Sequence, residues 1–242
     1  MSAAPYREIP SFVSVPSAGE VEAIVVNPEP ATAMLAFAHG AGAGISHPFM
    51  QACAVGLARH GIGTLRYQFP YMERRAAGER RPPDRAPVLI ATVRAAVARA
   101  RALAPGVPVL AGGKSMGGRM TSLAAAEEPL RDVAGIVFFG FPLHPAGRPS
   151  IDRAAHLADV ALPMLFLQGT RDALAELALL RPILADLGPK ATLKELDGAD
   201  HSFHVLKRSG RTDDDVLAEL GESVAAWVAG LSGPARPAAA PG

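Results

Sequence analysis

One stretch near the middle of the chain, residues 107–125, restricts the possible folds most strongly. It reads VPVLAGGKSMGGRMTSLAA: a short apolar run, a glycine pair, Lys114 and Ser115, a second glycine pair and a helix-forming run. An apolar run of this length that ends at glycines is typical of a buried strand. The stretch therefore predicts a strand, a sharp turn at Ser115 and a helix, with the serine hydroxyl lifted above the edge of a sheet.

The glycines around Ser115 form the pattern G-x-S-x-G at residues 113–117. Side chains at Gly113 or Gly117 would crowd the helix against the strand. A serine at a helix N-terminus also lies where backbone N–H groups stabilise negative charge. We interpret Ser115 as a candidate nucleophile, with a purely structural glycine-rich turn as the alternative. A phosphate-binding loop is excluded because Pro108 stands where that motif requires glycine.

Composition narrows the class of protein. The 242 residues include 24 basic and 23 acidic side chains, so the charge balance favours neither a nucleic acid nor an anionic membrane as partner. Because Cys53 is the single cysteine, an internal disulfide is excluded. We expect Cys53 to be a small core residue on a helix. The N-terminus lacks a secretory pattern and no apolar run has membrane-spanning length, so we expect a soluble, cytoplasmic protein. The sequence leaves the oligomeric state open.

Apolar runs alternate with helical patterns along the chain. An N-terminal hairpin is expected at residues 11–15 and 21–26. Further strands are expected at 33–38, 63–67, 108–111, 133–140, 162–168 and 191–196, and helices at 49–60, 88–103, after Ser115, 175–187 and 213–231 with Thr212 or Asp213 as cap. The strands are continuously apolar, which predicts an α/β fold with a mainly parallel sheet and helices on both faces. We expect one domain over residues 1–232, with a disordered Pro/Ala-rich tail at 233–242.

A reactive serine needs a base and a group that orients the base, and the sequence offers both. Asp172 follows the strand expected at 162–168, and His201 follows the last strand. Functional groups of parallel sheets lie at the carboxyl ends of the strands, so Ser115, Asp172 and His201 are expected to converge.

Other residues compete for these roles. Asp172 also suits the cap of the following helix. Asp197 and Asp200 are alternative acids, although their closeness to His201 in sequence makes its far nitrogen awkward to reach, and His204 is an alternative base. The remaining histidines do not follow the last strand and form no zinc-binding pattern, so no metal is expected; they are His39, His47, His60, His144 and His156.

The loop HGAGAG at residues 39–44 follows an expected strand and is a natural source of backbone donors. An oxyanion hole would combine the N–H of Met116 with that of Ala41, or of Gly40. The loop misses the dinucleotide pattern G-x-G-x-x-G because Ile45 stands at the third glycine, so no cofactor is expected.

These motifs together resemble the α/β-hydrolase superfamily over nearly the whole chain. The segments GGKSMGGRM, HGAGAG, FPYMERR, FPLHP and ADHSF look closer to bacterial relatives of the KANL3/Tex30-like hydrolases, which are similar to the dienelactone hydrolase group. That group uses a cysteine nucleophile where this chain has Ser115. The resemblance implies the α/β-hydrolase fold and a Ser115–His201–Asp172 triad. Some members of the branch are scaffold subunits.

The expected function is hydrolysis of small or short-acyl esters through an acyl-enzyme. Residues 133–163 are too few for a cap domain beside their strand, which predicts a shallow, open pocket. A catalytically silent binding module remains an alternative, as does an acyltransferase or thioesterase that uses the same residues.

Several residues near the expected strand ends are candidates for substrate binding: Tyr71, Arg74, Arg75, Phe141 and His144. The arginine-rich insertion at residues 71–87 is expected at the rim, where its arginines would favour an anionic acyl or leaving group. The alternative is a solvated loop with internal ion pairs. Lys114, beside the candidate nucleophile, either lowers neighbouring pKa values or points to solvent.

Overall fold

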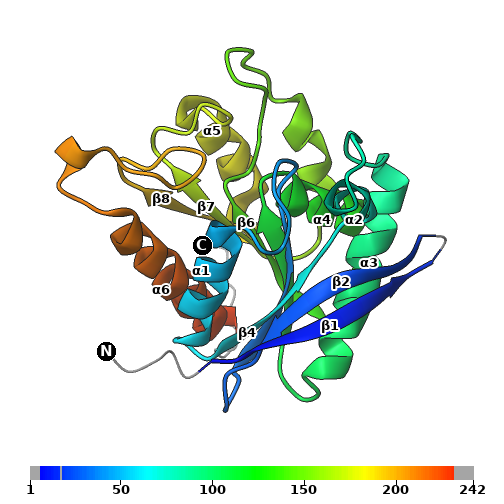
Figure 1. Ribbon diagram of the computed structural model, residues 1–242. Helices are drawn as coiled ribbons and strands as arrows, with labels where there is room; N and C mark the ends of the chain where they lie inside the picture. The colour runs from blue at the N-terminus through cyan, green and yellow to red at the C-terminus, as the bar shows by residue number, and fades with distance from the viewer. Residues whose placement is uncertain (1–5, 17, 232–242) are drawn as a thin grey trace, which may run out of the picture.

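The computed structural model describes residues 6–16 and 18–231, and its centre is an eight-stranded sheet (Figure 1). The strand order is β1-β2-β4-β3-β5-β6-β7-β8. The strands are β1 (Glu8–Val15), β2 (Gly19–Val26), β3 (Ala33–Ala38), β4 (Ile62–Tyr67), β5 (Val109–Lys114), β6 (Val133–Phe139), β7 (Met164–Gly169) and β8 (Ala191–Leu196). β1 and β2 form an antiparallel hairpin, β2 joins β4 antiparallel, and the other strand pairs are parallel. The predicted hairpin and mainly parallel sheet are confirmed.

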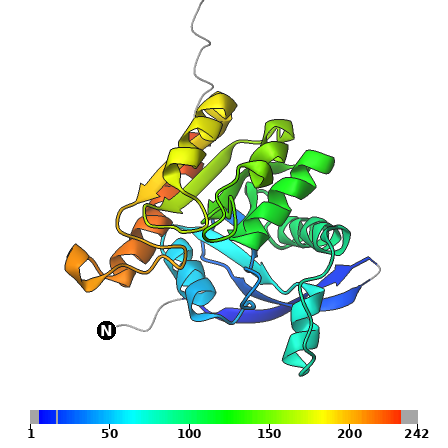
Figure 2. The same cartoon turned by 90° about the horizontal axis from the view of Figure 1, so that it is seen from above.

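Helices cover both faces of this sheet (Figure 2). One face carries α1 (Pro48–Ala58) and α6 (Asp213–Leu231), whose apolar side chains form one core with the sheet. The other face carries α3 (Ala86–Leu103), α4 (Met116–Glu127) and α5 (Leu177–Leu187), which form a second core. Every residue of β3, β4 and β7 is buried, and β3 and most of β7 are accordingly apolar without alternation. β4 also carries the buried Arg66, which donates to the carbonyl oxygen of Ile45 and pairs with Glu8.

Local features follow from particular residues. Thr212 caps α6, because its hydroxyl accepts from the Asp215 N–H at 3.2 Å while the Asp215 carboxylate accepts from the Thr212 N–H at 2.8 Å. Cys53 is buried in α1, as expected. No helix within the described residues is long and apolar enough to cross a membrane. The tail predicted at 233–242 lies outside the described residues.

The short helices were not predicted. The arginine-rich insertion begins with α2 (Pro70–Ala76), where Pro70 starts the helix and buried Tyr71 and Met72 anchor it. The connection between β6 and β7 contains a 3₁₀-helix, η1 (Asp152–Asp159), and no cap domain. Two further 3₁₀ turns are η2 (Gly188–Lys190) and η3 (Lys207–Ser209).

Glycines let α4 lie very close to the sheet. A Cβ at Gly117 would lie 2.6 Å from the carbonyl oxygen of His39 and 2.8 Å from that of Ala38. A Cβ at Gly112, on β5, would lie 2.1 Å from the carbonyl oxygen of Val137. Both neighbours are backbone, which has little room to shift, so these glycines fix the distance between α4 and β3 and between β5 and β6.

We expect Gly117→Ala to lower the free energy of unfolding by about 1–3 kcal/mol, because the added methyl forces α4 away from β3. The matched control is Gly230→Ala on α6, where an added Cβ meets nothing within 4 Å and helix propensity improves. Urea unfolding followed by circular dichroism compares the two. Equal stabilities would show that the close packing at Gly117 is relaxed at no cost.

Candidate active site

Ser115 occupies the turn between β5 and α4 in a strained conformation. Its φ of 51° and ψ of −116° lie in a region that side-chain-bearing residues rarely adopt, at a cost of about 1–3 kcal/mol. The Ser115 N–H donates to the carbonyl oxygen of Phe139 at 3.1 Å, which ties the turn to the end of β6. The turn therefore holds the serine hydroxyl at the carboxyl edge of the sheet.

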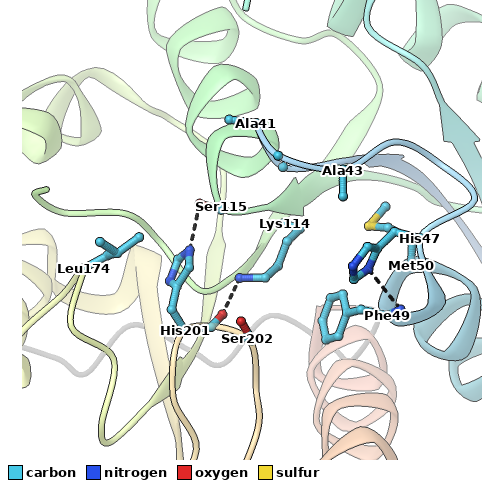
Figure 3. Close-up of a pocket in the computed structure, with 12 residues that line it drawn as sticks. Ala41, Ala43, His47, Phe49, Met50, Lys114, Ser115, Leu174, His201 and Ser202 are labelled. Carbon is cyan, nitrogen blue, oxygen red and sulfur yellow. Dashed lines mark hydrogen bonds between the residues drawn. The ribbon is translucent and has the colours of Figure 1, made fainter. Parts of the chain in front are cut away.

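The structure brings the three residues predicted from sequence into one hydrogen-bonded row. His201 Nε2 lies 2.8 Å from Ser115 Oγ, and His201 Nδ1 lies 2.7 Å from Asp172 Oδ2. Figure 3 shows the His201 ring beside Ser115, joined to it by a hydrogen bond. Each of the three residues stands at or just after the carboxyl end of a strand, β5, β7 or β8. An imidazole placed between a hydroxyl and a carboxylate is the arrangement that activates a serine.

The Asp172 carboxylate is held by two further donors. Gln168, the next-to-last residue of β7, donates through Nε2 to Oδ2 at 2.5 Å, and the Leu174 N–H donates to Oδ1 at 2.7 Å. Gln168 also accepts from the Phe141 N–H at 2.9 Å, so its amide is oriented from both ends. Sequence reasoning missed Gln168; its signal was a single polar residue at the end of an apolar strand.

The competing acids and base lie elsewhere. Asp200 accepts from the backbone N–H groups of Ser202 and His204 and thereby shapes the loop. Asp197 accepts from the Thr170 hydroxyl. The exposed His204 pairs with Asp213. The Asp213 carboxylate raises the pKa of His204 by its hydrogen bond and by its negative charge.

The loop at residues 39–44 is held from behind by α2 and by its own first residue. Tyr71 Oη donates to the carbonyl oxygens of Ala41, at 3.1 Å, and Gly40, at 3.4 Å. His39 Nε2 accepts from the Phe69 N–H at 3.0 Å, so its Nδ1 carries the proton toward Gly40 O, 2.7 Å away. Burial lowers the pKa of His39 to about 4, which keeps the ring neutral. Neither role was predicted from the sequence.

A pocket of about 330 Å³ opens beside Ser115 and His201 (Figure 3). Glycine and alanine residues of the 39–44 loop form one side of the pocket, and Phe49 and Met50 of α1 form an apolar wall. None of the lining residues is acidic; they are Gly40, Ala41, Gly42, Ala43, His47, Phe49, Met50, Lys114, Ser115, Leu174, His201 and Ser202.

The aromatic and histidine residues predicted to bind substrate do not line this pocket, so that prediction was wrong for them. Tyr71 and Phe141 are fully buried, and Phe141 packs against Phe138 and Phe166. His144 is buried too, and its Nε2 accepts from the N–H of Glu176 at 3.3 Å.

Arg74 and Arg75 are also absent from the pocket lining. Arg74 forms an ion pair with Asp84. Arg75 stacks over the Tyr71 ring, 5.1 Å from its centroid, and donates to the carbonyl oxygen of Arg81. The ion pairs of Arg74 with Asp84 and of Arg81 with Glu79 match the alternative of a loop with internal ion pairs, whereas Arg75 is held by carbonyl oxygens and the Tyr71 ring. The described residues contain no group of three or more His, Cys, Asp or Glu side chains placed to hold a metal ion.

Comparison with known proteins shows the family of this chain. A family model described as an alpha/beta hydrolase domain matches residues 31–229, most of the chain. The chain belongs to the α/β-hydrolase family. The match begins just before β3 and ends within α6, so it covers the strands from β3 to β8 together with Ser115, Asp172 and His201, and leaves out the hairpin of β1 and β2.

Several solved structures have a fold similar to that of this α/β-hydrolase. It is similar to a dienelactone hydrolase from Anabaena variabilis ATCC 29413, with a TM-score of 0.72, 22% identity and coverage of 93% of this chain and 98% of that one. It is also similar to an α/β serine hydrolase without a lid from Xanthomonas campestris, with a TM-score of 0.69, 23% identity and coverage of 96% of this chain and 97% of that one. An esterase domain from Rhodothermus marinus matches with a TM-score of 0.67, 18% identity and coverage of 91% of this chain and 97% of that one. At these identities the likeness establishes the fold.

We expect Tyr71→Phe in this hydrolase to loosen the loop, because it removes the hydroxyl that binds Gly40 and Ala41. The unfolding free energy should fall by about 1 kcal/mol, and amide hydrogen exchange should accelerate at residues 40–44. Tyr67→Phe is the matched control, since it removes a core hydroxyl that bonds Thr121 and not the loop. Unchanged exchange in the loop of Tyr71→Phe would contradict the bracing role.

The buried His39 predicts a pH dependence of stability. Folding lowers the pKa of His39 from 6.5 to about 4. Between these pH values the His39 ring is therefore protonated in the unfolded chain and neutral in the folded protein. The unfolding free energy should therefore fall as pH drops through this window, by up to about 1.4 kcal/mol per unit from this group. His39→Gln should reduce the fall in the free energy of unfolding between pH 7 and pH 5, measured by urea unfolding at both pH values. An unchanged slope would contradict the assignment.

Proposed function

We propose that this α/β-hydrolase is a serine hydrolase of small or short-acyl esters, with Ser115 as nucleophile, His201 as base and Asp172 as the group that orients the base. The observation that carries the proposal is the position of the His201 ring, 2.8 Å from Ser115 Oγ and 2.7 Å from Asp172 Oδ2. The similar serine hydrolase without a lid and the similar esterase domain support the same reaction class.

The reaction proceeds in two acyl transfers. His201 Nε2 takes the Ser115 proton while Oγ forms a bond to the ester carbonyl carbon, and the carbonyl oxygen becomes the oxyanion. His201 returns that proton to the leaving alcohol oxygen as its bond to the acyl carbon breaks. A water molecule then attacks the acyl-serine, again with His201 as base, and the acid product leaves with Ser115 restored.

Asp172 keeps His201 in the required tautomer. Its Oδ2 accepts from Nδ1, which leaves Nε2 free to accept the serine proton, and its negative charge stabilises the imidazolium that forms. The donors from Gln168 and Leu174 fix the carboxylate in place.

Peptide geometry supports Ala41 as an oxyanion donor. The N–H of Ala41 shares a trans peptide with the carbonyl of Gly40, so the two groups point in opposite directions. That carbonyl faces His39 Nδ1 and Tyr71 Oη at 2.7 and 3.4 Å, on the buried side of the loop. The Ala41 N–H therefore faces the pocket. Met116, the first residue of α4, contributes the second N–H, which has no partner within a helix at that position.

The size of the pocket favours small substrates. About 330 Å³ of space, without a cap domain to enclose it, accommodates a short acyl chain rather than a long lipid chain. Thioesters of the same acyl groups fit the same chemistry and belong in the same screen. We also infer from GGKSMGGRM, HGAGAG and ADHSF that the chain stands in the KANL3/Tex30-like branch of the family.

The test is hydrolysis of a series of acetyl to hexanoyl 4-nitrophenyl esters. We expect turnover that declines with acyl length, loss of all turnover in Ser115→Ala, and a fall of kcat by about a thousandfold or more in Asp172→Asn, which favours the wrong tautomer of His201. Circular dichroism confirms that each variant is folded. Turnover that persists in Ser115→Ala would contradict the assignment of the nucleophile.

A further inference from the structure

Lys114 places an ammonium group in the pocket next to the nucleophile. Its side chain leaves the end of β5 and runs beneath Ser115 toward the His201 loop (Figure 3). The ammonium donates to the carbonyl oxygen of His201 and lies over the rings of Phe203 and Phe49, 5.2 and 5.8 Å from their centroids. Those two rings stack on each other 5.4 Å apart. This aromatic platform fixes the position of the ammonium group.

The cation has no ion-pair partner among residues 6–16 and 18–231, where no carboxylate lies within salt-bridge distance of it. An ammonium carries three N–H donors, and the contacts of Lys114 include one hydrogen bond. Burial lowers its pKa to about 8, although Asp172, Cys53 and Asp200 act in the opposite direction. At neutral pH the pocket thus holds a poorly solvated positive charge, which an anion from outside would stabilise.

A second donor faces Lys114 across the same pocket. His47 caps α1, and its Nδ1 accepts from the Phe49 N–H at 3.2 Å. The proton of the neutral ring is therefore on Nε2, and this edge of the ring faces the pocket (Figure 3). With no acidic residue in the lining, the end of the pocket between Lys114 and His47 combines donors with the apolar wall of Phe49 and Met50.

Leu174 and His47 lie on opposite sides of His201 in the pocket (Figure 3). His201 Nε2 must reach the leaving oxygen, so a leaving alcohol on the Leu174 side puts the acyl group between Lys114 and His47. We propose that Lys114, with His47, binds a carboxylate carried by the acyl group, so that the preferred substrates are monoesters of short dicarboxylic acids. The proposal rests on the proposed ester hydrolysis and replaces Arg74 and Arg75, which do not line the pocket, as the source of an anion preference.

Two substrates isolate the charge. Monomethyl glutarate and methyl pentanoate differ only in a terminal carboxylate against a methyl group, and proton release at constant pH measures kcat/KM for both. We expect the wild-type protein to prefer the glutarate ester, and Lys114→Met to lower the ratio of the two kcat/KM values by about tenfold to a hundredfold, the loss expected for a hydrogen bond to a charged group. Lys114→Arg should retain part of the preference.

The ratio of the two kcat/KM values distinguishes a role of Lys114 in binding the carboxylate from a role in positioning His201. If Lys114 only held the His201 carbonyl, Lys114→Met would slow both esters equally and leave the ratio unchanged, which would overturn the proposal. The matched control is Lys190→Met, which removes a lysine at the amino end of β8, at the opposite edge of the sheet, and should leave the ratio intact. A ratio that falls equally in both variants would reflect net charge and would also overturn it.

The ratio should depend on pH with a defined sign. Lys114 loses its proton as pH rises through about 8, so the preference for the glutarate ester should decline above that value in wild type and stay flat in Lys114→Met. Asp172, Asp200, Cys53 and His201 surround the ammonium group, and their effects on the common chemical steps cancel in the ratio. A ratio that is flat for the wild type through pH 9 would contradict the role of the ammonium.

Binding without turnover distinguishes this proposal from the proposed function. Calorimetric titration of Ser115→Ala with monomethyl glutarate should give binding that is weakened by about tenfold or more in Ser115→Ala/Lys114→Met. If wild type hydrolyses no ester but this difference is found, the anion site stands and the hydrolase proposal fails. If methyl pentanoate is hydrolysed and the two titrations agree, the hydrolase proposal stands and the anion site fails.

Discussion

The structure depends on the close approach of α4 to the end of β5. Gly118 packs against the carbonyl of Gly113 on β5, and Gly117 packs against the backbone of β3, at distances that no side chain would permit; the chain turns between strand and helix within one residue. Ser115 bears the strain of that turn, with a positive φ that the surrounding packing enforces. The serine hydroxyl is therefore placed by the core of the protein rather than by a mobile loop, in reach of groups at neighbouring strand ends.

Around this point the site is organised by hydrogen bonds directed from the buried side. Gln168 fixes Asp172, Asp172 fixes His201, and Lys114 binds the carbonyl of His201, so the imidazole is constrained at its ring and at its backbone. On the other side His39 and Tyr71 hold the 39–44 loop through its carbonyl oxygens. Each group that faces the pocket is thus supported by a partner behind it, an arrangement that reduces reorganisation during a reaction.

The sequence predicted those parts that follow from chain order and periodicity. Continuous apolar strands indicated the parallel sheet, and the position of Asp172 and His201 after their strands indicated that they lie near Ser115. The directions of side chains after strand ends were not predictable: Phe141 and His144 turn into the core, and Arg75 stacks on Tyr71. The placement of Lys114 in the pocket depends on Phe49 and Phe203, which are distant in sequence and meet only in the fold.

The central claim is that His201 and Asp172 activate Ser115. Intact-mass measurement after treatment with a fluorophosphonate, followed by peptide mapping, tests it most directly, because the reagent labels only serines whose hydroxyl is activated. The account predicts one adduct per chain, located on Ser115 and absent from His201→Gln. An unlabelled but folded wild-type protein, or equal labelling of wild type and His201→Gln, would contradict it.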